Sequence, residues 1–173
     1  KDPSPASFFY TVHTIPPRTI LTSAIQRSSN PITNSSNTKS NAVMFEFSGN
    51  DTGGVGIDHL ECSLDGTSFS ACTSPVQFTS ANLLDGTHSF MVIAQDKVGN
   101  MMTTPVLFNW TVDTLPPTTA INTAIDGNNG TLVSGNSTMS TSMTFTFSGN
   151  DRGIENNGVG IKQIECSIDN SNF

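Results

Sequence analysis

The sequence predicts an all-β protein made of tandem β-sandwich repeats of about 100 residues each. Apolar side chains alternate with polar ones along several short runs, which is typical of strands with one face on a core and the other in water. Turn signals such as Asp65-Gly66 and Asp85-Gly86 separate these runs. Long segments also recur at a fixed spacing, and no run shows a convincing helical stripe.

Seven strands are expected in the best-defined repeat. Val43, Phe45 and Phe47 share one face of their run, and Phe108 and Trp110 share one face of another. Together with the turn signals, this alternation places strands roughly at 18–22, 42–49, 57–64, 68–73, 75–79, 87–95 and 105–113. About seven short strands in a repeat of this length is typical of an immunoglobulin-like sandwich.

The repeat is visible directly in the sequence. TVHTIPPRT at 11–19 returns as TVDTLPPTT at 111–119, an offset of 100 residues. ECSLDGTSF at 61–69 returns as ECSIDNSNF at 165–173, an offset of 104 residues. The difference is an insertion of four residues within 152–158, which belongs in a surface loop because both flanks remain readable.

These offsets set the domain boundaries. We interpret residues 1–13 as the last strand of a preceding repeat, 14–117 as one complete repeat and 118–173 as the first half of the next. The chain begins with Lys and ends within a half repeat, so we expect it to be cut from a longer array. In the segment 1–13, the side chains expected on the core face are Ala6, Phe8, Tyr10 and Val12.

Composition limits the classes of partner. The net charge is −7, so the basic footprint of a nucleic-acid-binding protein is absent. No apolar run approaches the ~20 residues of a membrane-spanning helix. The acidity fits either cation binding or solubility alone.

Three motifs carry a resemblance to a known family. They are ECSLDGTSFSACTSPVQF at 61–78, LLDGTHSFMVIAQDKVGN at 83–100 and FNWTVDTLPP at 108–117. In this order they resemble the immunoglobulin-like, fibronectin type III-like tandem repeats of bacterial and archaeal extracellular surface proteins. The resemblance implies an extracellular β-sandwich array that serves as a stalk, an adhesin or a filament, without implying one ligand.

The three cysteines predict one disulfide and half of another. Cys62 and Cys72 lie in one repeat, and Cys166 matches Cys62 at the offset of 104, with its own partner expected beyond the end of the chain. Disulfides imply an oxidising compartment, so we expect an extracellular or cell-surface location. The alternative is a pair of buried free thiols; a metal site is disfavoured because no nearby His or further Cys completes four ligands.

Five asparagines stand in glycosylation sequons: Asn34, Asn50, Asn109, Asn129 and Asn136. Asn109 falls on the outward face of its strand, and the others fall in expected loops. The alternative is chance, because a chain rich in Asn and Ser produces sequons without any selection for sugar.

Calcium is the cofactor that the joints between repeats suggest. In an immunoglobulin-like sandwich, Asp51 and Asp96 would lie near the incoming linker, and Asp151 would lie near Asp113 in the next joint. His13 stands where the second joint has Asp113, which weakens the first site. Asp96 could instead cap its own turn.

Catalytic signals are poor, so we expect no enzyme activity in this chain. His13, His59 and His88 lack metal-ligand spacing, and His59 and His88 read as ordinary strand residues. The leading function is an extracellular structural repeat that contacts neighbouring repeats or copies of itself, with assembly by strand donation as one route. The alternatives are a sugar- or protein-binding adhesion module, for which the candidate aromatic residues are Phe9, Phe69 and Phe173, and an accessory domain of a secreted enzyme.

Overall fold

The computed structural model describes residues 4–152 and 158–169, and every regular element in that part of the chain is a β-strand. The ten strands are β1 (Arg18–Gln26), β2 (Ser36–Thr38), β3 (Val43–Asn50), β4 (Ile57–Leu64), β5 (Ser70–Cys72), β6 (Val76–Phe78), β7 (Gly86–Asp96), β8 (Val106–Val112), β9 (Thr118–Asp126) and β10 (Met143–Asn150). The prediction of an all-β protein is therefore confirmed. No helix that could cross a membrane occurs among the described residues.

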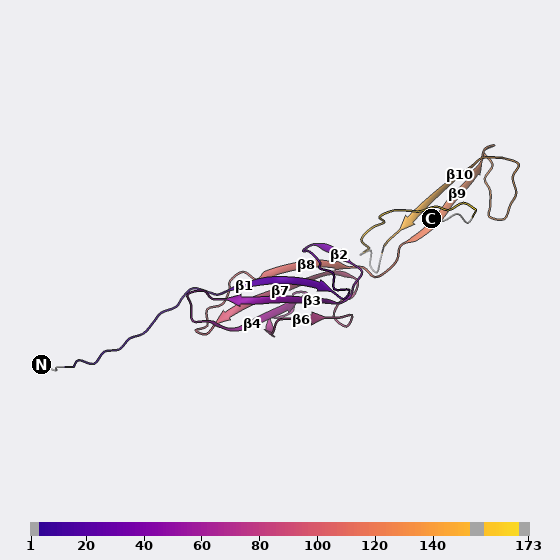
Figure 1. Ribbon diagram of the computed structural model, residues 1–173. Helices are drawn as coiled ribbons and strands as arrows, with labels where there is room; N and C mark the ends of the chain where they lie inside the picture. Colours follow the sequence, from indigo (N-terminus) through magenta and orange to yellow (C-terminus); the bar gives the residue numbers. More distant parts are fainter. Residues whose placement is uncertain (1–3, 153–157, 170–173) are drawn as a thin grey trace.

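Strands β1 to β8 form two sheets that pack face to face, here called the sandwich (Figure 1). One sheet has the order β1-β3-β6, and the other has the order β2-β8-β7-β4-β5. All pairs are antiparallel except β2 with β8, which is parallel. The two sheets share one core because the alternating apolar side chains of each point toward the other.

The core is built around Phe45 of β3. Its ring stacks on Phe90 of the opposite sheet with the ring centres 4.3 Å apart, and it meets Phe108 and Trp110 at 5.3 and 5.4 Å. All four side chains are buried. The faces predicted from period-two alternation in these strands are therefore confirmed.

The seven strands expected in this region all form; β4 has the expected bounds, and the other six differ by a few residues at their ends. β1 extends to Gln26 rather than 22, because it pairs with β3 along its whole length through a bulge between Leu21 and Ser23. β2 was missing from the prediction. Its residues are polar and lie in a Ser- and Asn-rich stretch, so no apolar alternation marks it.

β9 and β10 form a separate two-stranded sheet with the register of β1 and β3. Arg18 pairs with Asn50 in the first sheet, and Thr118 pairs with Asn150 in the second, so both numbers differ by 100. The apolar faces of these two strand pairs differ in how far they are buried. Phe145 and Phe147 are 47% and 46% exposed, whereas Phe45 and Phe47 are buried, because the described residues provide no second sheet to pack on β9 and β10.

Two segments expected to be strands are not strands in the structure. Residues 4–17 form no strand, and Phe8, Tyr10 and Val12 are exposed in place of facing a core. Residues 161–168, which match β4, also form no strand, since β4 itself lies between β5 and β7 and the second copy offers no such neighbours among the described residues. The domain boundaries at 13 and 117 stay predictions.

Replacing the central ring of the core tests this packing. Phe45→Ala removes a fully buried aromatic side chain and leaves a cavity, so we expect the free energy of unfolding to fall by about 3–5 kcal/mol in urea denaturation. The control is Phe9→Ala, which removes a side chain that is 89% exposed and should change stability by less than ~0.5 kcal/mol. Equal effects from the two variants would contradict the assignment of the core.

Candidate cation site where the chain enters the sandwich

The incoming chain meets two loops at one end of the sandwich. β1 begins beside the last residue of β3, since Arg18 pairs with Asn50, and β4 begins beside the end of β7, since Ile57 pairs with Asp96. The β3–β4 loop and the β7–β8 loop therefore flank the residues that precede β1. The strand order thus brings together side chains that are far apart in sequence.

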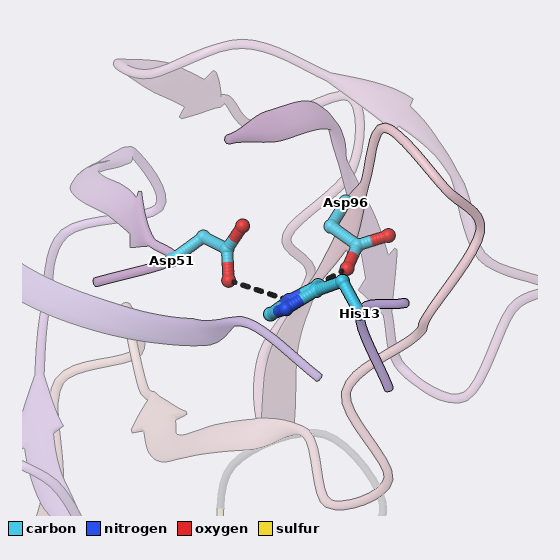
Figure 2. A group of neighbouring side chains, drawn as sticks. All are labelled: His13, Asp51 and Asp96. Atoms are coloured by element: carbon cyan, nitrogen blue, oxygen red, sulfur yellow. Dashed lines mark ion pairs between the residues drawn. The ribbon is translucent and has the colours of Figure 1, made fainter. Parts of the chain in front are cut away.

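His13, Asp51 and Asp96 meet at this end (Figure 2). His13 Nε2 lies 3.5 Å from Asp51 Oδ1 and 3.4 Å from Asp96 Oδ2. One ligand atom from each residue lies within 4.8 Å of the other two. The side chains of Asp51 and Asp96 are 4% and 0% exposed, and that of His13 is 12% exposed, so water has little access to the cluster.

Asp96 is held by its own loop. Its Oδ1 accepts hydrogen bonds from the amides of Val98 and Asn100, and its Oδ2 accepts one from Asn100 Nδ2 at 2.8 Å. Burial alone would raise the pKa of Asp96, but the hydrogen bonds from Asn100 and Val98, with the nearby His13, lower the pKa below its ordinary value of 3.8. Asp96 is therefore a carboxylate at neutral pH. The capping role that the sequence suggested for it is present as well.

Asp51 is oriented by the β3–β4 loop. Its Oδ2 accepts a hydrogen bond from the Gly56 amide at 2.8 Å, which leaves Oδ1 directed at His13. Gly54 makes room for this carboxylate, because a Cβ at position 54 would lie 2.2 Å from both Asp51 oxygens. Gly56 has a φ of +92°, a conformation that favours glycine.

The linker is tied to the sandwich through its backbone as well. Asn100 Nδ2 donates to the carbonyl oxygen of His13 at 3.1 Å, and the same amide group holds Asp96. His13 was expected to weaken a cation site, and sequence reasoning did not place it in one. The sequence feature that could have revealed this role of His13 is its alignment with Asp113, since histidine and aspartate are both metal ligands.

The second joint, between β8 and β9, has a different arrangement. Asp113 is buried, and its oxygens accept hydrogen bonds from the amides of Leu115 and Val159 at 3.2 and 3.0 Å. Asp151 is half-buried. Among the described residues, the group close enough to hold a metal is the one at His13, so calcium at Asp113 and Asp151 stays a prediction.

Cys62 and Cys72 form a disulfide between the paired strands β4 and β5. Cys62 is part of the core, and Cys72 packs against it. Cys166 has a free thiol and is exposed.

Four of the five sequon asparagines are exposed, namely Asn34, Asn50, Asn129 and Asn136. Asn109 is half-buried on β8, and its backbone N–H donates to Asn34 Oδ1 at 2.7 Å, so two sequons lie side by side. Glycosylation of these asparagines stays a prediction.

The other histidines have structural partners. His88 is buried against Trp110, with Nδ1 2.8 Å from Asp65 and Nε2 2.7 Å from the carbonyl of Leu84. His59 is partly exposed between Asp58 and Glu61, whose hydrogen bonds raise its pKa above 6.5.

Comparison with known proteins gives little for this sequence. No protein-family model matches it, and no curated protein matches it. One solved structure that resembles it is described as the extracellular domain of a proposed one-component system from B. thetaiotaomicron. The match has 18% sequence identity and a TM-score of 0.42, and it covers 62% of this chain. This chain spans 16% of the length of that structure.

The lowered pKa of Asp96 predicts an acid-sensitive joint. A carboxyl whose pKa is lower in the folded state contributes stability above its unfolded pKa, and this contribution is lost as the pH falls through the folded pKa. We expect carboxyl-detected NMR to give Asp96 a titration midpoint below 3.8. A midpoint at or above that value would contradict the hydrogen-bond assignment.

The disulfide should stabilise the sandwich measurably. It closes a short loop with a sequence separation of 10, so the double variant Cys62→Ala/Cys72→Ala should lose roughly 3 kcal/mol of unfolding free energy in the chain-entropy model. The matched control is Cys166→Ala, which removes an exposed thiol outside the sandwich and should leave the urea midpoint unchanged.

Proposed function

We propose that this chain is a structural spacer of an extracellular array, built from immunoglobulin-like repeats. The carrying observation is that the chain enters the sandwich at one end and leaves it at the other (Figure 1). The incoming linker meets the end of β7 at Asp96, whereas the outgoing linker follows Val112, which pairs with Gly86 at the start of β7. Sandwiches connected in this way extend along one line.

Both linkers are tied to the sandwich, which supports a stiff spacer. Asn100 and the carboxylates at the entrance hold His13. At the exit, the amide and hydroxyl of Thr114 both donate to Asp85 Oδ1, at 3.0 and 2.8 Å. The adjacent Pro-Pro pairs at 16–17 and 116–117 restrict the backbone further.

The chemistry of the disulfide supports an extracellular location. A disulfide that joins two strands and lies against the core persists in an oxidising compartment, which supports a secreted or surface protein. A spacer requires no catalytic group, in line with the expectation that the chain is not an enzyme.

The adhesion and strand-donation alternatives have weaker support. Of the three aromatic residues considered for an adhesion surface, Phe9 is exposed, Phe69 is half-buried and Phe173 lies outside the described residues, so no aromatic cluster is formed by the described pair. Strand donation would place residues 4–12 against another subunit. The exposure of Phe8 and Tyr10 fits this, and it equally fits a neighbouring repeat in the same chain.

The spacer role predicts a fixed gain in length for each repeat. β7 has 11 residues, so the sandwich spans roughly 35 Å, and an extended linker adds roughly 15 Å. Proteins with two, three and four copies of residues 14–117 should therefore lengthen by about 50 Å per copy in small-angle X-ray scattering. The variant Pro116→Gly/Pro117→Gly should bend at the joint and lengthen less. Compact particles whose length does not follow copy number would contradict the proposal.

A further inference from the structure

His13 Nε2 is a buried nitrogen without a hydrogen-bond partner. It lies between two carboxylate oxygens at 3.4 and 3.5 Å, beyond the usual 2.7–3.2 Å of an N–H···O hydrogen bond. A buried polar atom that is left unpaired is costly, and native proteins rarely retain one. We propose that His13, Asp51 and Asp96 bind a divalent transition-metal ion of the zinc type, which clamps the incoming linker to the sandwich.

The spacing of the ligand atoms fits such an ion. Zinc binds imidazole nitrogen and carboxylate oxygen at about 2.0–2.2 Å with tetrahedral geometry, so two ligand atoms on one ion lie roughly 3.3 Å apart. The two distances from His13 Nε2 are close to this separation. One oxygen of the Asp51 carboxylate lies within 4.8 Å of one oxygen of the Asp96 carboxylate, so the two carboxylates need only a small approach.

The ligands are already oriented by the protein. Asp96 uses Oδ1 for two backbone amides and directs Oδ2, which also accepts a hydrogen bond from Asn100 Nδ2, at His13. Asp51 uses Oδ2 for Gly56 and directs Oδ1 at His13. Each carboxylate therefore has one oxygen fixed by its own loop and one directed at the imidazole. Metal sites depend on this second layer of hydrogen bonds to orient their ligands.

The donor set favours zinc over calcium. Calcium takes six to eight oxygen ligands, whereas this cluster contributes one imidazole nitrogen and two carboxylate oxygens. Imidazole suits zinc, copper and nickel, and three protein ligands leave a fourth position for water or another group. At the second joint, Asp113 stands where the first has His13, so the imidazole ligand is absent from that position.

The proposed binding has a structural consequence, because His13 lies in the linker, whereas Asp51 follows β3 and Asp96 ends β7. One ion would then connect three segments of the chain. The proposed zinc binding is independent of the spacer role. Only the idea that zinc stiffens the joint rests on that role.

The test is isothermal titration calorimetry of the untagged 173-residue protein, first stripped with a chelator and then titrated with zinc chloride. We expect one zinc ion per chain, and His13→Ala should weaken binding by at least about tenfold. His59→Ala is the matched control, since His59 also lies beside two carboxylates, at Asp58 and Glu61, and its loss should leave the affinity unchanged. His13→Asp should lower the affinity for zinc and raise that for calcium. Because His13 precedes every strand, the fold should survive its replacement, which circular dichroism checks.

Three results would overturn the proposal. They are the absence of saturable zinc binding up to ~1 mM, zinc binding that survives His13→Ala, and a higher affinity for calcium than for zinc in the unaltered protein. An anomalous-scattering peak at the zinc edge between the three side chains would support it independently of the calorimetry. None of these results depends on how the length of the array changes with copy number, so failure of this site and failure of the spacer role can be told apart.

Discussion

The stacking of Phe45 on Phe90 is the contact on which the rest of the sandwich depends. It joins the two sheets at their centre, and Phe108 and Trp110 complete a group of rings that fills the space between them. Large aromatic side chains bury much apolar area at a small cost in side-chain entropy, which suits a small domain. Once β3 and β7 are fixed by this contact, their ends are fixed too. Asp51, which follows β3, and Asp96, which ends β7, are then brought to the same place.

How much of this could be predicted depends on where the information lies. The positions of β3, β4, β7 and β8 are encoded locally, because alternating side chains face one core. β2 is not encoded in this way. It is placed by its parallel pairing with β8 and by the hydrogen bond from the Asn109 amide to Asn34, both of which are contacts between distant segments.

In the candidate site, too, one part could be predicted from the sequence and another part depends on contacts between distant segments. The nearness of Asp51 and Asp96 followed from the expected strand order, since that order predicts which loops share an end. The distance of His13 from each carboxylate did not follow from it. That distance depends on the path of the linker, which Asn100 sets by binding the His13 carbonyl oxygen. No local pattern around residue 13 reveals this bond, because its donor is 87 residues away.

The placement of the two linkers has a mechanical consequence. The chain enters through β1, which belongs to one sheet, and leaves through β8, which belongs to the other. Tension applied through the two linkers would therefore pull the two sheets in opposite directions and pass through the aromatic core between them. Along β1, the hydrogen bonds to β3 run across the direction of pull, so they would be loaded together in shear instead of opening one after another. The resistance of the sandwich to force would thus depend on the packing of Phe45 and on the β1–β3 ladder, and the Cys62–Cys72 disulfide would lie outside the path of the load.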